Sequence, residues 1–265
     1  MSDPAAVLDD LREESAELDR LVGQLSDEGW AAPTPAPGWT VAHQIAHLAW
    51  TDRAALLAAT DPDAFAAEVA RAMAAPDRFV DEGAEEGAEL PPADLLATWR
   101  TGREHLQDAL RAAPAGTRFP WYGPPMSVPA MATARLMETW AHAQDVADTL
   151  GVTRVPTARL RHVAWIGARA RDYAYLVRGL PAPAGPFRIE LDGTGIDGTT
   201  WAYGPEDAAQ KVTGPALDFC LLVAQRVHRA DTALVAHGAD AERWLTIAQA
   251  FAGPAGAGRA PREAG

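Results

Sequence analysis

Hydrophobic residues recur with a helical period through the first 180 residues of the chain. Leu8, Leu11, Leu18 and Val22 follow one another at spacings of three, seven and four residues, which is typical of the apolar face of an amphipathic helix. The same periodicity, bounded by proline and glycine, predicts further helices over residues 41–59, 63–75, 93–112, 128–150 and 157–177. The acidic, glycine-containing stretch 81–89 is expected to be a solvated loop or a frayed turn.

The period changes after the proline-rich segment 181–186. Apolar and polar residues alternate over 187–191 and 199–203, which predicts the two strands of a hairpin, and a helix, a short strand and a helix are expected at 215–228, 233–237 and 240–251. The turn of this hairpin matches the pattern G-x-G-x-x-G, but a strand follows it instead of the helix that would bind a phosphate, so a flexible turn is favoured. We therefore expect a mainly α protein with a helical domain over 1–180, a small α+β domain over 186–252 and a disordered tail over 253–265.

Composition narrows the class of protein. The chain has 265 residues, of which 48% are hydrophobic, and its formal net charge is −13. This composition excludes a disordered chain, and the acidic charge without a Lys/Arg stripe disfavours a nucleic-acid partner. Cys220 is the single cysteine, the N-terminus is acidic and lacks the features of a signal peptide, and no apolar run reaches membrane-spanning length. We expect a cytoplasmic protein without a membrane partner, as a monomer or a homodimer.

Two histidines lie at i and i+4 in the helix predicted at 41–59. His43 and His47 share one face there, and this spacing suits two ligands of one metal. The segment also resembles the metalloprotease motif H-E-x-x-H, but Gln44 stands where the glutamate base is needed. The alternative is that both are ordinary histidines, one exposed and one hydrogen-bonded in the core.

The helix predicted at 128–150 carries four ionisable side chains within an arc of about 80°: Arg135, Glu138, His142 and Asp145. Its other positions are largely apolar, so the helix should be buried, and buried charges need partners or a metal. With His47 on a facing helix, Glu138 and His142 form a His₂Glu set that leaves one coordination position open, as in catalytic zinc sites. Asp145 is expected to accept a hydrogen bond behind these ligands, and Arg135 to neutralise Glu138 or Asp145.

Two tryptophans are candidates for the wall of a substrate pocket. Trp50 shares a helical face with His43 and His47, and Trp140 lies on the helix that carries Glu138. Each of them can equally be a plain core residue. His43 is the candidate acid/base group, because an imidazole exchanges a proton near neutral pH. The alternative for His43 is again a packed, hydrogen-bonded histidine.

Two segments resemble the DinB-like metal-binding bundle of the mycothiol-dependent maleylpyruvate isomerase family: 37–48 (PGWTVAHQIAHL) and 138–151 (ETWAHAQDVADTLG). Segment 212–226 (VTGPALDFCLLVAQR) is similar to the sterol-carrier-like domain of that family. The resemblance implies an up-and-down four-helix bundle with a divalent metal, usually zinc, on His47, Glu138 and His142. It also implies that Arg226 engages the substrate. The chain departs from the family at His43, where an acidic or other polar residue is usual, and at Gln225, where glycine is usual.

The resemblance and the ligand set together predict a divalent-metal-dependent enzyme acting on a small unsaturated carboxylate. A metal-activated low-molecular-weight thiol of the mycothiol type would add to the double bond, giving cis/trans isomerisation or S-transfer. Arg226 would bind the carboxylate or the developing oxyanion, and His43 would move the proton. Two alternatives stay open: a thiol-independent metal-dependent hydrolase or hydratase/lyase of a biosynthetic pathway, and a non-enzymatic protein that binds a metal or a small ligand.

Overall fold

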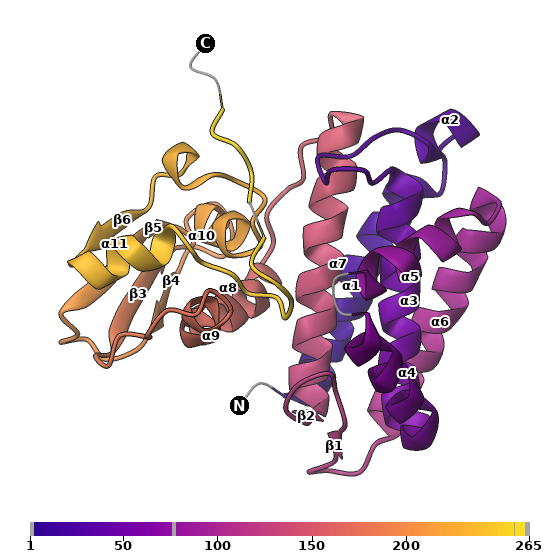
Figure 1. The fold of residues 1–265 in the computed structure, drawn as a ribbon. Helices are drawn as coiled ribbons and strands as arrows, with labels where there is room; N and C mark the ends of the chain where they lie inside the picture. Colours follow the sequence, from indigo (N-terminus) through magenta and orange to yellow (C-terminus); the bar gives the residue numbers. More distant parts are fainter. Residues whose placement is uncertain (1–2, 76–77, 257, 263–265) are drawn as a thin grey trace. The chain divides into compact units, whose positions relative to one another are not determined.

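The protein divides into two compact units, Met1–Arg154 and Val155–Gly265 (Figure 1). A computed structural model describes residues 3–75, 78–256 and 258–262. Helices dominate the first unit, and the second combines a four-stranded sheet with short helices. The predicted fold class, mainly α with a small α+β domain, is confirmed.

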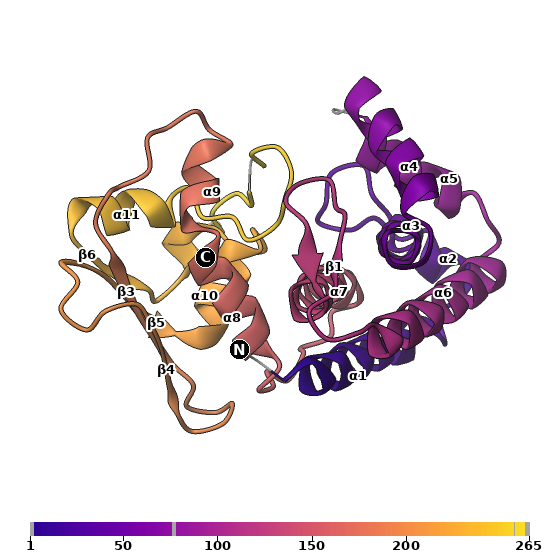
Figure 2. The same ribbon diagram turned by 90° about the horizontal axis from the view of Figure 1, so that it is seen from below.

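Four long helices form the bundle of the first unit: α1 (Pro4–Val22), α3 (Val41–Thr60), α6 (Pro92–Ala112) and α7 (Val128–Leu150). Helix α3 packs against α6 and α7, and α1 packs against the same two helices. Figure 2 shows α3 and α7 end-on, with α1 and α6 beside them. The connections contain α2 (Asp27–Trp30), α4 (Pro62–Ala74), α5 (Phe79–Ala88), and the two-residue strands β1 (Arg118–Phe119) and β2 (Met126–Ser127).

The ends of α7 follow from local chemistry. Ser127 accepts a hydrogen bond from the backbone N–H of Ala130, which satisfies one of the free donors of the first turn. Gly151 ends the helix at φ 65°, a left-handed conformation that costs glycine little. Both ends agree with the prediction. Between them α7 is buried on nearly every face, as its apolar sequence predicts.

An ion-pair cluster ties α1 to α6. The Asp19 carboxylate receives Arg100 at 2.5 Å and Arg103 at 2.5 Å. The hydrogen bond from Arg100 and the charge of Arg103 outweigh the effect of burial, so the pKa of Asp19 lies below its ordinary value. The cluster therefore stabilises the bundle only while Asp19 is ionised.

Helix α5 includes residues that the sequence predicts as a loop. A Cβ on Gly83 would lie 2.8 Å from the Trp50 indole, and one on Gly87 would lie 2.8 Å from the Cβ of Ala46. The two glycines are four residues apart on one face, so they allow α5 to approach α3 closely. The loop prediction for 81–89 is wrong because these glycines serve helix packing and not a turn.

The sheet of the second unit has the strand order β4-β3-β5-β6. Strand β3 (Phe187–Asp192) pairs antiparallel with β4 (Thr200–Tyr203) and parallel with β5 (Gln210–Pro215), which in turn pairs antiparallel with β6 (Val235–His237). The predicted hairpin is confirmed, and left-handed glycines at 195 and 198 form its turn. Strand β5 was not predicted, and the helix expected at 215–228 is shorter: α10 (Ala216–Val223).

The boundary between the units lies earlier than predicted. Helix α8 (Leu160–Arg169) packs against α10, and α9 (Arg171–Leu176) packs against α11 (Ala239–Leu245). Both helices therefore belong to the second unit. The domain boundary placed near residue 180 is wrong because this helical segment shares the core of the sheet and not that of the bundle.

The tail 253–265 is only partly described. The backbone N–H of Gly253 bonds the Tyr173 hydroxyl, and the backbone N–H of Arg262 bonds Asp231. The disorder expected of this tail stays a prediction. Residues 257 and 263–265 lie outside the described residues. No helix in the described part of the chain is long and apolar enough to cross a membrane.

Candidate metal centre

Helices α3 and α7 bring three predicted ligands together inside the bundle. Oε2 of Glu138 lies 3.5 Å from Nε2 of His47 and 3.3 Å from Nε2 of His142. One donor atom from each residue falls within 4.8 Å of the others. The i,i+4 spacing on α7 and the contact between α3 and α7 therefore assemble the set that the sequence predicts.

The cluster is largely shielded from water but not closed. The side chains of His47, Glu138 and His142 are 9%, 22% and 10% exposed, so Glu138 is the most exposed of the three. Burial raises the pKa of Glu138, but the contacts with His142 and His47 outweigh it and hold this pKa well below the ordinary value. Glu138 is therefore a carboxylate at neutral pH, which is the form that binds a metal.

Gln44, one turn before His47, orients His142 through a short chain of hydrogen bonds. The Thr34 hydroxyl donates its single proton to the carbonyl of Trp39 at 2.9 Å, so it accepts from Nε2 of Gln44, also at 2.9 Å. Oε1 of Gln44 consequently faces Nδ1 of His142, at 2.5 Å. Because an amide oxygen only accepts, Nδ1 of His142 carries a proton, and the other ring nitrogen, Nε2, faces Glu138.

This arrangement fits a divalent metal. Two ligand atoms that each lie about 2.1 Å from a tetrahedral zinc ion are about 3.4 Å apart. The two contacts of Glu138, 3.5 and 3.3 Å, match that separation. With Nδ1 of His142 held by Gln44, Nε2 faces Glu138 in the orientation of a metal ligand. On His47 the outer nitrogen, Nδ1, is buried and has no hydrogen-bond partner among the described residues.

Two aromatic rings flank the ligands, and one of them was not predicted. The Trp39 ring stacks on His142 at a centroid distance of 6.0 Å and lies 5.4 Å from the ring of His47. Trp50 was predicted, and its ring lies 5.9 Å from that of His47. Trp140 is buried two residues beyond Glu138, about 200° around α7, and its place in the pocket wall stays a prediction.

His43 starts helix α3. Its Nδ1 accepts the backbone N–H of Thr40 at 3.2 Å and lies 2.8 Å from the Thr40 hydroxyl, so His43 closes a capping box. The ring is half-buried, and its centroid lies 6.4 Å from that of Trp39. The structure thus gives His43 a capping role and places it beside the aromatic wall, outside the ligand set.

The two residues predicted behind the ligands, Arg135 and Asp145, lie on α7. Arg135 bonds Asp52 of α3 through Nε at 2.9 Å, a carboxylate partner that the sequence did not indicate. Asp52 comes from another helix, which the spacing along α7 does not show. Asp145 is fully buried, and the outer nitrogen of His142 faces Oε1 of Gln44.

The remaining predicted residue, Arg226, belongs to the second unit. It directly follows the turn that ends α10, and its Nη1 donates to the carbonyl of Ala224 at 2.7 Å. Cys220 on α10 is fully buried, and burial raises the pKa of its thiol. The thiol is therefore protonated and inaccessible in the folded protein.

The helical bundle of the first unit has the fold of the DinB-like proteins, and three potential metal ligands point into it. The family model described as the mycothiol maleylpyruvate isomerase N-terminal domain matches residues 11–147. The chain belongs to this family. A second model, described as Wyosine base formation, matches residues 183–237, within the unit for which the resemblance implies a sterol-carrier-like domain.

The chain is also similar to two relatives by sequence and to two solved structures by fold. Proteins described as uncharacterized from two strains of Mycobacterium tuberculosis are 56% identical over 259 residues, covering 98% of this chain and 100% of theirs. Crystal structures of the mycothiol-dependent maleylpyruvate isomerase and of a histidine-to-alanine mutant are similar, with TM-scores of 0.60 and 0.61 at 16% and 18% identity. Each match covers 89% of this chain and 93% of the other, and shows that the fold is shared.

Proposed function

We propose that this protein is a divalent-metal-dependent enzyme that uses a small thiol of the mycothiol type to isomerise, or to transfer sulfur to, a small unsaturated carboxylate. The observation that carries the proposal is the convergence of His47, Glu138 and His142 on one point of a site that is largely shielded from water. Membership of the family supports the thiol. Because Cys220 is buried, the reacting thiol has to arrive with a small molecule.

The ligand residues fit zinc, which when bound supplies a Lewis acid that lowers the pKa of a thiol. His142 is held by Gln44 with Nε2 directed at the site, and Glu138 provides the anionic ligand. Trp39 and Trp50 limit access of water beside the ligands. Addition of the thiol sulfur to the double bond, rotation and loss of the same sulfur give the isomer, whereas retention of the sulfur gives S-transfer.

Two residues have roles that rest on the family resemblance and on their chemistry. Arg226 would bind the substrate carboxylate, for which its planar cation is suited. His43 would move the proton, and Nε2 is the nitrogen available for it because Nδ1 accepts the hydrogen bond from the Thr40 backbone. Zinc as the metal and the cytoplasm as the compartment are part of the same proposal.

Metal analysis followed by a thiol-dependence assay tests the proposal. The purified protein should hold one divalent ion per chain, and His47→Ala or His142→Ala should lose it while the far-ultraviolet circular dichroism stays helical. His105→Ala, an exposed histidine on α6, is the matched control and should keep the metal. A wild-type chain that holds no divalent ion and does not respond to added zinc would refute the site.

Maleylpyruvate is the first substrate to assay, with and without mycothiol. Turnover that requires both the metal and the thiol supports the proposal. Turnover that survives removal of thiols but not chelation would identify a thiol-independent hydrolase or lyase. A fully metal-loaded protein without turnover of unsaturated carboxylates would identify a binding protein.

A further inference from the structure

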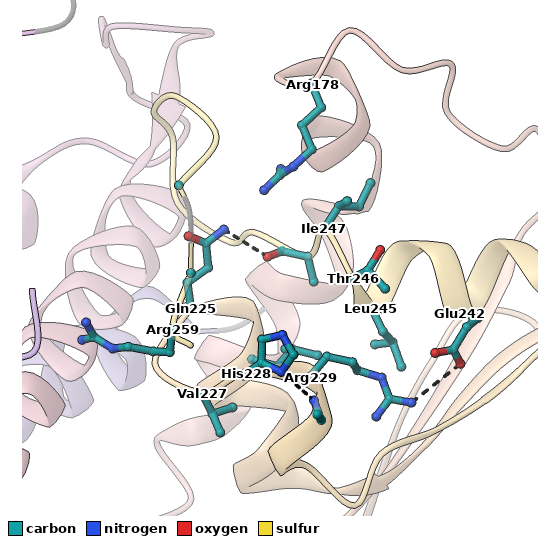
Figure 3. A pocket seen from close by; sticks show the side chains of 15 residues that line it. Arg178, Gln225, Val227, His228, Arg229, Glu242, Leu245, Thr246, Ile247 and Arg259 are labelled. Atoms are coloured by element: carbon teal, nitrogen blue, oxygen red, sulfur yellow. Dashed lines mark hydrogen bonds and ion pairs between the residues drawn. The ribbon is translucent and has the colours of Figure 1, made fainter. Parts of the chain in front are cut away.

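A cavity in the second unit is lined by two arginines, Arg178 and Arg229, that have no carboxylate closer than 3.7 Å among the described residues (Figure 3). Its volume is about 430 Å³, within the usual range of small-ligand sites. Arg178, Arg229 and His228 line it together with apolar side chains such as Leu245 and Ile247. The wall therefore combines positive charge with an apolar surface.

Arg178 is the first cation of this cavity wall, and its hydrogen-bond partners are neutral. Its Nη1 donates to the Ala174 carbonyl at 3.2 Å and to Oε1 of Gln249 at 3.4 Å, and both acceptors are neutral. Burial lowers the pKa of the Arg178 guanidinium, with no opposing contribution from a carboxylate. A partly desolvated cation with neutral partners is costly unless an external anion compensates it.

Arg229 gives the second sign. Its Nε is buried and has no hydrogen-bond partner among the described residues. Its nearest carboxylate oxygen, on Glu242, lies 3.7 Å from Nη2 and belongs to a side chain that is 59% exposed, so this ion pair is weak. His228 adds a donor, because its Nδ1 accepts the backbone N–H of Ala230 and the proton of the neutral ring lies on Nε2.

The backbone beside these residues carries strain. Gln225, which lines the cavity, has φ 58°, the left-handed region, and is the one non-glycine residue of the described ranges to adopt it. The N–H groups of Gln225 and Arg226 bond the carbonyls of Leu222 and Leu221, which is the turn where a helix normally ends in glycine. Gln225 therefore carries a backbone cost that glycine would avoid, at a position whose side chain lines the cavity.

Charge distribution supports the same conclusion. Residues 155–265 contain 12 basic and 11 acidic side chains, in a chain whose net charge is −13. The acidic excess of the protein therefore lies in the first unit. The cavity belongs to the part of the chain that does not repel an anion.

We propose that this cavity binds a small molecule that carries a carboxylate or phosphate group on an apolar body. Arg178 and Arg229 hold the anionic group, for which their planar guanidinium groups are suited. Leu245 and Ile247 cover the apolar body, and Gln225 supplies a neutral polar contact. All residues of the site belong to the second unit, so binding does not depend on the metal centre.

Hexanoate and hexyl phosphate, with hexanol as the neutral analogue, test the site on the full chain after removal of metal by a chelator. The titration is followed by ¹H–¹⁵N spectra of the arginine Nε–H groups at constant ionic strength. We expect at least one of the two anions to bind saturably and to shift the Arg229 signal. The anion that binds with higher affinity shows whether the site prefers a carboxylate or a phosphate. Equal binding of hexanol, or no saturable binding of either anion, would overturn the proposal.

Variants assign the site to its residues. Arg178→Gln and Arg229→Gln should each weaken binding about 10- to 100-fold, the effect of losing one hydrogen bond to a charged group. Arg243→Gln removes an exposed arginine of α11 and should leave affinity unchanged. If Arg229→Gln does not fold, the affinity of Arg178→Gln, which changes a different segment, tests the assignment. Equal losses of affinity in Arg178→Gln and Arg243→Gln would contradict it.

Gln225→Gly separates binding from stability. Glycine adopts the left-handed conformation without strain, so the thermal midpoint should rise or stay constant. Ligand affinity should nevertheless fall several-fold, because a polar contact of the cavity is lost. Unchanged affinity in this variant would show that the Gln225 side chain has no part in the site.

Discussion

Replacing Gln44 by leucine should weaken metal binding without touching a metal ligand. The variant removes the acceptor at 2.5 Å from Nδ1 of His142 and the donor at 2.9 Å from Thr34, while an apolar side chain of similar size fills the buried position. Without the amide oxygen, His142 gains freedom to rotate or to carry its proton on Nε2, the atom that faces Glu138. Both changes compete with coordination.

The size of the effect follows from the position of Gln44 behind a ligand. Loss of a hydrogen bond to the outer nitrogen of a metal-bound histidine reduces affinity about 10- to 100-fold, which is about 1.4–2.7 kcal/mol. Gln44 is fully buried, so water does not replace the lost contact freely. We therefore expect the upper part of that range. Global stability should fall by about 1–3 kcal/mol, the cost of a buried unsatisfied donor.

Zinc affinity is measured by competition with a chromogenic chelator, and the tautomer of His142 by ¹⁵N chemical shifts of the metal-free protein. Gln44→Glu keeps an acceptor toward His142 and should stay closer to the wild type than leucine does. Gln144→Leu makes the same change on α7 at a residue that bonds Asp148 instead, and should bind zinc normally. Wild-type affinity and an unchanged tautomer in Gln44→Leu would refute the orienting role.

Three further predictions concern stability, each measured by urea unfolding. Gly83→Ala forces a methyl group into the facing indole of Trp50 and should lower the free energy of unfolding by about 1–3 kcal/mol. The control Gly102→Ala places its methyl group in open space on α6 and should raise the free energy of unfolding by about 0.4–1 kcal/mol. Equal effects of the two variants would contradict the close packing of α5. Arg135→Met leaves Asp52 buried and unpaired and should cost about 3–5 kcal/mol, of which the double variant with Asp52→Leu should recover most. The pKa of Asp19 is lower in the folded chain than its unfolded value of about 3.9, so its contribution is complete above that pH and is lost as the pH falls through the folded pKa. Asp19→Asn should flatten this acid-side slope, and an unchanged slope would exclude the group.

The ligand set could be predicted because its spacing is local. His142 follows Glu138 by four residues, so any helix places both on one face, and the apolar sequence around them indicates that this face is buried. His47 could be added because the facing helix carries it at a position directed inward. The resemblance to a known family pointed to the same three residues.

Other parts of the site could not be predicted because they depend on contacts between distant segments. Trp39 lies in the loop before α3 and reaches His142 only after the bundle has formed. Gln44 was considered only as the residue that stands in place of a protease base. For Arg135 the sequence offered acids on the same helix, whereas the partner, Asp52, comes from α3. Helical periodicity gives the face of each helix but not which side chains meet across the interface.

The fold shows the same limit at its glycines and its boundary. Gly83 and Gly87 suggested a loop, since glycine is common in turns, although here they bring α5 close to α3. The helical segment 157–177 continued the pattern of the bundle, so periodicity alone assigned it to the wrong unit. The packing of this segment against α10 and β4 assigns it to the second unit.

Because Cys220 is buried, the reactivity of its thiol reports when the second unit opens. This thiol is the single cysteine and is fully buried under α8, where its sulfur contacts the Leu160 carbonyl at 3.5 Å. A thiol reagent therefore modifies the chain only when the second unit opens, and the labelling rate under native conditions measures the free energy of that opening. Since the first unit has no cysteine, the same reaction is silent to fraying of the metal-binding bundle. One unmodified protein thus allows the stability of its second unit to be followed separately, in the presence or absence of metal.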